Sequence, residues 1–535
     1  MWTYAPPGFL GSCFLAIGSL GIGWFPISAN ALQWPIVNFF QTQNLGIALA
    51  RAFLVVGAAL LIQAWLMVGL DAVKGRIEQI QTLHLALLSW CTPLLIAVPL
   101  FSRDVYSYYM QGQMQLSGHS PYTSGVAVVP GWFSSGVDPL WGDAPSPYGP
   151  VFLLIERFVA GITGESALTS VLYFRIFAVI GVALMCWQLP KLAQRHGINP
   201  IAALWLGALN PLVVFHFVAG AHNDSLMIGF ALWGINKALD RKFANALFLI
   251  TLALAIKPSA FVVLPFFGLW LLAVLTRETN WANRWRVIET RNVIEHNEAQ
   301  NPEIEIVEKS QYTLVGKTLA VLAAVLGSVL ILAIFSLLAG VHPFGWISAL
   351  VRPGSVRSWL APSTLIGMMS SNFFHVLGFA SHADKIIMIC RLVGLFFLAA
   401  GLIYILNSIQ RRSITRSIAL AFVVLVICSP AVQPWYLLWF IPLLAATGLT
   451  QKHLRVVVSF VVGFAIHDIA NSAETGNSFL GFSDTVAIVI SVLILLVAII
   501  SSPRERALLL GTAHDSGMLP TGVAELTRWN AMRFQ

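Results

Sequence analysis

The stretch IALARAFLVVGAALLIQAWLMVGL, residues 47–70, carries a single charged side chain, Arg51. As a helix, a segment of this length crosses the hydrocarbon core of a bilayer, which is roughly 30 Å thick. Similar runs recur along the chain, and 57% of its 535 residues are apolar while only 10% are charged. Water-soluble domains do not show this composition. Because a spanning segment in lipid must satisfy its own backbone hydrogen bonds, the sequence predicts an all-α polytopic membrane protein.

The apolar runs predict about fourteen transmembrane helices, which places both termini on the same side of the membrane. Putting the termini in the cytoplasm assigns 22 of the 31 Lys and Arg residues to cytoplasmic segments, as the positive-inside rule requires. No basic residue precedes Arg51, so we expect an uncleaved first span in place of a signal peptide. The predicted spans are residues 8–26, 47–70, 85–101, 166–189, 199–218, 223–239, 243–257, 259–276, 317–340, 384–408, 415–430, 433–450, 453–472 and 483–502.

Two long segments then face the outer side of the membrane, and we expect them to form short interfacial helices and turns. Residues 149–163 are too short to span comfortably, so we expect a re-entrant or interfacial helix there. The cytoplasmic loop is rich in both acids and bases, and we interpret it as a flexible spacer. The predicted organisation is a transmembrane module, residues 1–502, with outer loops 102–148 and 341–383, a cytoplasmic loop 277–316 and a cytoplasmic tail 503–535.

Composition also excludes some partners. The formal charge is +8, but the basic residues are scattered at helix ends and are not interleaved with exposed aromatic residues, so we expect no nucleic-acid partner. The five cysteines all fall inside apolar runs, which indicates neither a disulfide framework nor a zinc site.

The first candidate for chemistry is Asp104, in the sequence SRDVYSYY at residues 102–109, directly after the third predicted span. A carboxylate at the outer interface is partly desolvated, which suits a general base. The alternative is an ion pair between Arg103 and Asp104 that anchors the helix end.

A second polar cluster, GAHNDS at residues 220–225, joins two apolar spans on the same predicted side. Asn223 or Asp224 could cap the following helix. A cap alone does not need His222, Asn223 and Asp224 together, so we expect at least one of them to face a cavity.

The third candidate is Lys257, which precedes Pro258 inside a long apolar stretch. Proline disfavours helical backbone at the residue before it, so the helix should break here and restart near Ser259. A new helix N-terminus beside a lysine is suited to binding phosphate, whereas the alternative is a lysine that extends to the membrane surface.

Aromatic and basic residues on the predicted outer side are weaker evidence for a binding site. The aromatic ones would stack on a sugar or lie at the lipid headgroups, and the arginines of the second outer loop would bind an anionic headgroup or remain solvated. These residues are Trp132, Trp141, Tyr148, Trp435, Tyr436, Arg352 and Arg357.

Taken in order, these motifs resemble one family. RDVYSY at 103–108, GAHND at 220–224, Lys257-Pro258, WLAPST at 359–364 and PWYLLW at 434–439 are similar to the actinobacterial polyprenyl-phosphomannose-dependent α-1,6-mannosyltransferases of lipomannan synthesis. Those enzymes belong to the GT-C superfamily of membrane glycosyltransferases. The resemblance covers residues 85–450, and its specificity lies in the order of the motifs.

The resemblance implies a GT-C fold and inverting transfer of mannose from polyprenyl-phosphate-mannose. The implied acceptor is a mannolipid, a phosphatidylinositol mannoside or lipomannan, at the outer face of the plasma membrane. It implies Asp104 as the catalytic base. Other members carry paired acids where this chain has Arg103-Asp104, so we expect one carboxylate to do the chemistry. The implied phosphate-binding residues are Lys257, Arg352, Arg357 and Arg103, and the implied sugar-binding residues are His222, Asn223, Asp224, Tyr106, Tyr148, Trp435, Tyr436, Trp132 and Trp141.

No obligatory metal is expected, because fixed cations can stabilise a monophosphate leaving group, although a divalent ion would be tolerated if His222 and Asp224 supplied ligands. Two alternatives stay open. The donor could be polyprenyl-phosphate arabinose or the enzyme another GT-C glycosyltransferase. A secondary transporter or lipid-linked sugar flippase would also have broken helices and intramembrane charges.

Overall fold

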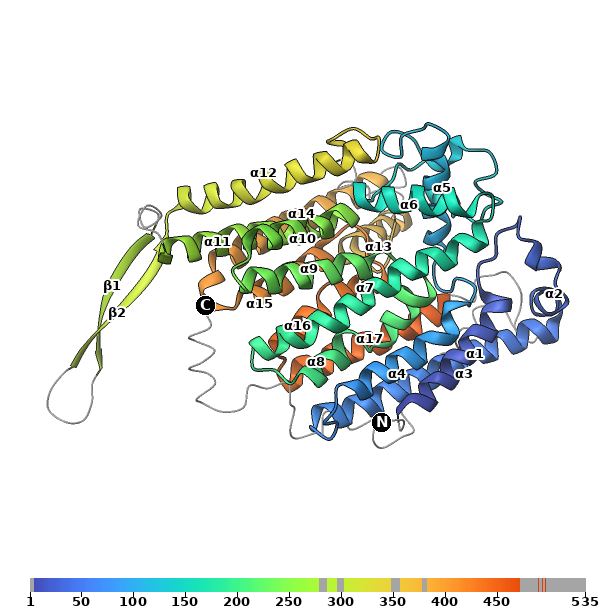
Figure 1. Ribbon diagram of the computed structural model, residues 1–535, viewed down its shortest axis with the longest axis horizontal. Coiled ribbons are helices and arrows are strands. Elements are labelled where there is room, and N and C mark those ends of the chain that lie inside the picture. The colour runs from blue at the N-terminus through green and yellow to red at the C-terminus, as the bar shows by residue number, and fades with distance from the viewer. Residues whose placement is uncertain are drawn as a thin grey trace.

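The computed structural model describes residues 4–278, 286–295, 303–347, 357–377 and 383–471, with three isolated positions beyond them. Most of the predicted span 483–502 lies outside these residues, as do the tail 503–535 and Arg352. The described chain is mainly a bundle of long helices (Figure 1).

Seven described helices are long and apolar enough to cross a membrane. The predicted count of fourteen stays a prediction, because several predicted spans are shorter or interrupted. Prolines account for two interruptions: Pro93 follows the end of α4, and Pro211 precedes a change from α-helix to π-helix. The seven candidates are Ala5–Ile22, Asn44–Val73, Ala167–Arg195, Pro258–Thr276, Leu314–Leu338, Ala383–Asn407 and Gln451–Ala470.

The N-terminal helices pack closely on one another. Helix α1 (Ala5–Ile22) lies along α3 (Asn44–Val73) and α4 (Gln81–Cys91), while α2 (Pro35–Thr42) is a short helix before α3. A Cβ atom at Gly11 would lie 2.7 Å from the carbonyl oxygen of Gly57, so glycine is required where the two backbones meet.

The predicted first outer loop, residues 102–148, contains the expected short helices. Helix α5 (Asp104–Leu116) begins at Asp104, and two 3-10 turns follow at Val126–Val128 and Pro139–Trp141. Residues 149–163 form α6 (Pro150–Thr163), which packs on α5. Its placement in the membrane remains a prediction.

The central helices show two interruptions that later meet at the site. Helix α7 (Ala167–Arg195) precedes α8 (Pro200–Gly207), which gives way to a π-helix at Val213–Ala219, and α9 (Asp224–Leu239) starts after a short turn. Helix α10 (Phe243–Ile256) ends before Lys257, whose backbone is extended at φ −141° and ψ 119°. The chain resumes as a 3-10 helix, Pro258–Val263, followed by α11 (Leu264–Glu278). The break predicted at Lys257-Pro258 is confirmed.

The segment predicted as a cytoplasmic loop contains structure that was not expected. Within residues 277–316, interpreted from the sequence as a flexible spacer of an all-α protein, β1 (Arg286–Glu295) and β2 (Glu303–Tyr312) form an antiparallel hairpin. The physical reason is the alternation of Glu with Ile and Val in EIEIVE, the pattern of a strand, which outweighed the segment's high charge. Figure 1 shows the hairpin projecting from the end of the bundle opposite α5 and α6.

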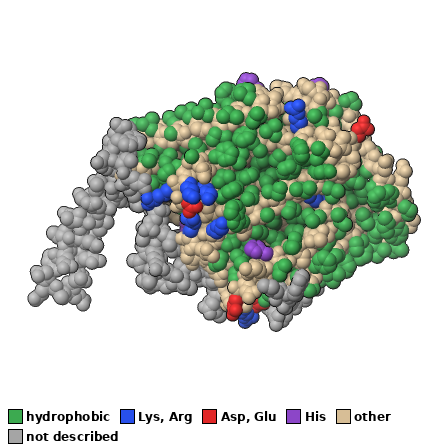
Figure 2. Space-filling model, viewed as in Figure 1, with side chains coloured by type: hydrophobic (Ala, Val, Ile, Leu, Met, Phe, Trp, Pro, Cys, Tyr) green, Lys and Arg blue, Asp and Glu red, His purple; other side chains and the backbone are tan. Residues whose placement is uncertain are grey.

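The C-terminal helices complete the described part of the bundle. They are α12 (Leu314–Leu338), α13 (Pro362–Val376), α14 (Ala383–Asn407), α15 (Ile414–Cys428), a 3-10 helix at Pro434–Trp439, α16 (Ile441–Thr447) and α17 (Gln451–Asn471). Large apolar side chains such as Leu330, Phe396 and Phe397 are exposed on this surface. Figure 2 shows a face covered with hydrophobic side chains, as lipid contact requires.

Candidate active site

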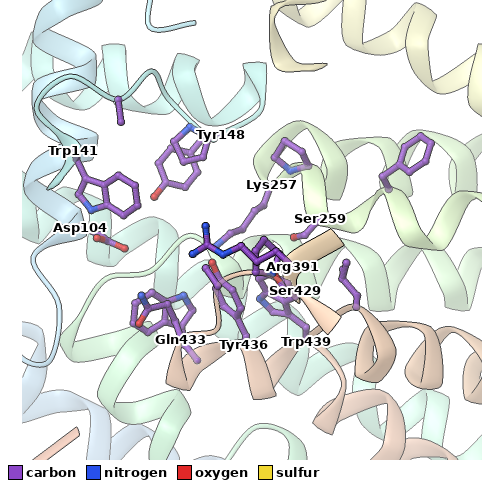
Figure 3. A pocket seen from close by; sticks show the side chains of 18 of the residues that line it. Asp104, Trp141, Tyr148, Lys257, Ser259, Arg391, Ser429, Gln433, Tyr436 and Trp439 are labelled. Carbon is purple, nitrogen blue, oxygen red and sulfur yellow. The ribbon is translucent and has the colours of Figure 1, made fainter. Parts of the chain in front are cut away.

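A cavity of about 1120 Å³ lies where α5 and the first outer loop meet the broken helix at Lys257, helix α14 and the 3-10 helix Pro434–Trp439. In Figure 3, Lys257 and Arg391 enter the cavity from one side, and Asp104 and Trp141 lie on the other. The cavity therefore combines residues from segments that are far apart in the sequence.

Lys257 is held at the cavity by a buried ion pair. Its Nζ lies 2.8 Å from both carboxylate oxygens of Asp224, whose side chain is fully buried. The indole N–H of Trp439 donates a third hydrogen bond to Asp224 at 2.6 Å. Lys257 Nζ also lies 5.3 Å from the centre of the Tyr436 ring and 5.4 Å from that of Trp439. These contacts hold the ammonium group at the cavity wall and leave part of it accessible, with the side chain 13% exposed.

None of His222, Asn223 and Asp224 lines this cavity, so the expectation that at least one of them would face it is not met here. Asn223 occupies the N-cap position of α9, but its side chain makes no capping hydrogen bond. Asp224 binds Lys257 and Trp439, so its carboxylate connects two interruptions of the bundle. Asn223 is buried and does not line the cavity.

Asp104 is the first residue of α5, and its side chain is 18% exposed. Its backbone N–H donates to Ser102 Oγ, and Trp141 forms a side-chain hydrogen bond with its carboxylate. Burial raises the pKa of Asp104 to about 6, a rise that the positive charge of Lys257 opposes and the negative charges of Asp138 and Asp224 reinforce. A carboxylate with this pKa is mostly ionised at pH 7 and is a stronger base than an ordinary aspartate.

Arg103 does not form the helix-anchoring pair with Asp104 that was the alternative reading. Its Nε lies 3.2 Å from Asp138, and its guanidinium lies 4.6 Å from the centre of the Trp24 ring. Arg103 still lines the cavity, so its predicted role at the donor phosphate remains untested.

His222 is a buried neighbour of Asp104. Its Nδ1 is 3.9 Å from the Asp104 carboxylate and 3.4 Å from the hydroxyl of Tyr108. The ring packs against Trp435, tilted by 33°, with 4.0 Å between centroids. Burial, the nearby His216 and Lys257 together hold the pKa of His222 well below its usual value. His222 is therefore a neutral polar neighbour of Asp104 and does not itself line the cavity.

The remaining predicted residues divide into two groups. Trp141, Tyr148, Trp435, Tyr436 and Arg357 line the cavity, and Arg357 forms an ion pair with Asp384 at its edge. Two others lie elsewhere: the Tyr106 hydroxyl donates to the backbone carbonyl of Trp24 at 2.6 Å, and Trp132 packs against Gly142.

The sequence reasoning missed Arg391 because it lies within the apolar helix α14, away from every motif considered. It lines the cavity, and its Nε donates to Thr364 Oγ1 at 2.9 Å. A charged residue inside a predicted span was the available signal. Ser259, Gln433 and Trp439 also line the cavity and were missed, although Ser259 and Gln433 adjoin motifs that were singled out and Trp439 ends the motif PWYLLW.

Below these polar groups the cavity is apolar. On α14, the apolar residues Leu395, Leu398, Leu402 and Leu406 follow helical spacing beyond Arg391 and line it together. At 1.5 Å per residue this apolar row is roughly 17 Å long, about half the thickness of a bilayer core. Phe261 and Phe266, from the segment after the break at Lys257, also line the cavity, as does Leu425 of α15.

No metal site is formed in the described part of the chain: no group of three or more His, Cys, Asp or Glu side chains could hold an ion there. Asp224, which was considered as a ligand beside His222, instead accepts from Lys257 and Trp439. The need for a metal remains untested.

A bundle of apolar helices with a carboxylate, a lysine and an arginine around one cavity fits the class of membrane-embedded glycosyltransferases. Residues 5–273 match the family described as alpha-(1->6)-mannopyranosyltransferase, N-terminal domain, and residues 363–506 match the MptB C-terminal domain. The chain belongs to this alpha-(1->6)-mannopyranosyltransferase family, and it is a mannosyltransferase.

Individual relatives agree along most of the chain. An alpha-(1->6)-mannopyranosyltransferase of Mycobacterium tuberculosis is 32% identical over 92% of this chain and 86% of its own length. Alpha-(1->6)-mannopyranosyltransferase A of the same organism is 30% identical over 86% of this chain and 82% of its own length. Alpha-(1->6)-mannopyranosyltransferase B of Corynebacterium glutamicum is 29% identical, over 82% and 72% respectively. No solved structure matches, and the GT-C fold stays a prediction.

Proposed function

We propose that this mannosyltransferase takes mannose from polyprenyl-phosphate-mannose and adds it, through an α-1,6 linkage, to a phosphatidylinositol mannoside or lipomannan at the outer face of the plasma membrane. The observation that carries the donor assignment is the composition of the cavity. Its polar end holds the cations Lys257 and Arg391, and its apolar part continues along α14 from Leu395 for roughly 17 Å, about half the thickness of a bilayer core.

This arrangement suits a lipid phosphate. The phosphate would lie between Lys257 and Arg391, and the polyprenyl chain would lie along the apolar row on α14. Each methylene removed from water contributes about 0.8 kcal/mol, so the donor stays in the membrane and presents only its headgroup. A nucleotide sugar would have no use for the apolar part of the cavity.

The chemistry proposed is a single displacement. Asp104 accepts the proton of the acceptor 6-hydroxyl while that oxygen forms a bond to the anomeric carbon of mannose. The bond from this carbon to the phosphate oxygen breaks, and its electron pair leaves with the lipid phosphate, whose charge Lys257 and Arg391 stabilise. Attack opposite to the leaving group converts a β-linked donor into an α-linked product.

The outer location is supported by two observations. The positive-inside rule assigns the first loop to the outer side. Figure 1 shows α5 and α6 at the end of the bundle opposite the charged hairpin β1–β2. These loops therefore face opposite sides of the membrane in the proposed topology, and both termini are cytoplasmic.

The test is a transfer assay with the full chain in lipid nanodiscs, a short α-1,6-mannoside as acceptor, and three separate donors. Polyprenyl-phosphate-mannose should support product formation, whereas polyprenyl-phosphate-arabinose and GDP-mannose should not. Product formed only from polyprenyl-phosphate-arabinose would favour the alternative in which the enzyme transfers arabinose. Transfer from GDP-mannose alone would refute the lipid donor.

A further inference from the structure

Three buried polar atoms of the cavity lining have no hydrogen-bond partner in the described part of the chain: Ser107 Oγ, Gln111 Oε1 and Trp435 Nε1. Ser107 is 3% exposed, Gln111 4% and Trp435 6%. A buried polar group without a partner costs about 1–3 kcal/mol, so such groups are normally satisfied. The three atoms are themselves covered, but their residues line the cavity, where a polar ligand can supply the missing partners once the side chains turn toward it.

Ser107 and Gln111 share one face of α5 with Asp104, because positions i, i+3 and i+7 lie above one another on a helix. At 1.5 Å per residue, Gln111 lies about 10 Å along the axis from Asp104. Residues of the predicted first outer loop, including Trp141, Pro145 and Tyr148, line the same cavity. The cavity is therefore lined by a row of polar side chains on α5 together with aromatic and proline side chains from the loop.

The chemistry of the three atoms matches hexose hydroxyls, each of which can both donate and accept a hydrogen bond. The Ser107 hydroxyl can do either, the Gln111 amide offers an acceptor beside its donors, and the Trp435 indole N–H only donates. Nearby aromatic rings such as Trp141 provide apolar faces for stacking on a sugar. An ionised phosphate could accept from Ser107 and Trp435 but has no donor for Gln111 Oε1, and an acyl chain has neither donor nor acceptor.

We propose that Ser107 and Gln111 form the acceptor subsite and bind the mannose units next to the attacking 6-hydroxyl. This rests on the proposed function. In a single displacement the acceptor and the leaving phosphate lie on opposite sides of the anomeric carbon. Lys257 and Arg391 mark the phosphate side, and Asp104, which touches the acceptor hydroxyl, marks the other. Ser107 and Gln111, which lie on the same face of α5 as Asp104, therefore contact the acceptor. Trp435 Nε1, beside His222, completes the pattern near the base.

The experiment compares Gln111→Leu and Ser107→Ala with Gln115→Leu, using α-1,6-dimannoside and polyprenyl-phosphate-mannose. Gln115 is a matched control, since it lies one turn further on α5 and also has a buried Oε1 without a partner, but does not line the cavity. We expect Gln111→Leu to lower kcat/KM for the acceptor about tenfold and to change the donor KM less than twofold. Equal losses in Gln111→Leu and Gln115→Leu, or a change confined to the donor KM, would overturn the assignment.

Deoxy acceptors make the test independent of folding defects. The wild type should lose about tenfold in kcat/KM on at least one dimannoside that lacks a single hydroxyl. Gln111→Leu should show no further loss on that analogue, because the partner is already absent. If Gln111→Leu does not fold, Gln111→Asn and Ser107→Ala serve in the same cycle. If every variant loses as much kcat/KM as the wild type on each deoxy analogue, the variant side chains do not bind those hydroxyls, and the subsite is excluded.

Failure of the proposed function would be distinguishable. A wild type that transfers no mannose from the lipid donor would refute the donor assignment. The subsite would then be tested by saturation-transfer NMR with the dimannoside alone, where Gln111→Leu should weaken binding about tenfold while Gln115→Leu does not. Equal dimannoside binding by all three proteins would refute the subsite.

Discussion

Lys257 Nζ lies 2.8 Å from both carboxylate oxygens of Asp224, and the two residues come from two separate interruptions of the helix bundle. The pair places a positive charge at the head of an apolar cavity. A buried charge that loses its partner is costly, so the position of Lys257 depends on Asp224.

We expect Lys257→Met to lower mannosyl transfer at least a hundredfold, the scale of one group that stabilises developing negative charge, chiefly through donor use. It should also destabilise the protein by about 3–5 kcal/mol, because Asp224 remains buried without its partner. The double variant Lys257→Met/Asp224→Asn should recover thermal stability but not activity. Recovery of both, or unchanged donor kinetics in Lys257→Met, would remove the lysine from the phosphate site.

Asp104→Asn should reduce transfer to a few per cent of wild type or less, because loss of a general base costs about 10²–10⁴ in rate. The assay uses equal amounts of folded protein in membranes supplied with the lipid donor. Asp143→Asn is the control, since Asp143 is an exposed acid of the same loop and does not line the cavity. Substantial activity in Asp104→Asn would require another base.

The pH dependence follows from the raised pKa of Asp104, about 6. The base acts only when ionised, so kcat/KM should fall about tenfold per unit below pH 6 and level off above it. Asp138→Asn removes a negative charge that raises this pKa, so the fall should move to lower pH. A fall that moves upward in that variant would contradict the assignment of the titrating group to Asp104.

The topology can be tested with single cysteines at two exposed positions, His119 of the first outer loop and Lys242 between α9 and α10. In intact cells, His119→Cys should react with a membrane-impermeant thiol reagent, whereas Lys242→Cys should react only after the membrane is opened. The five native cysteines require a parallel wild-type control. The inverse labelling pattern would place the cavity in the cytoplasm.

Much of the architecture was accessible from the sequence because its causes are local. Composition and run length require spanning helices, and Pro258 disfavours helical backbone at Lys257 wherever the segment lies. The same local reasoning missed the hairpin β1–β2, where the charge of the segment was weighed above its alternating pattern. It did bring the outer polar motifs to notice, including Asp104, the 222–224 cluster and Lys257.

Sequence alone thus determined a membrane-embedded chain with a broken helix and polar residues expected at one face. Only the tertiary structure decided the partners: Asp224 with Lys257, Arg103 with Asp138, and Tyr106 with the Trp24 backbone. It also brought Arg391 from α14 to the cavity and aligned Ser107 and Gln111 with Asp104 along its wall. Helical period shows which residues share a face, but which partner that face meets depends on how distant helices pack, and local propensity does not encode that.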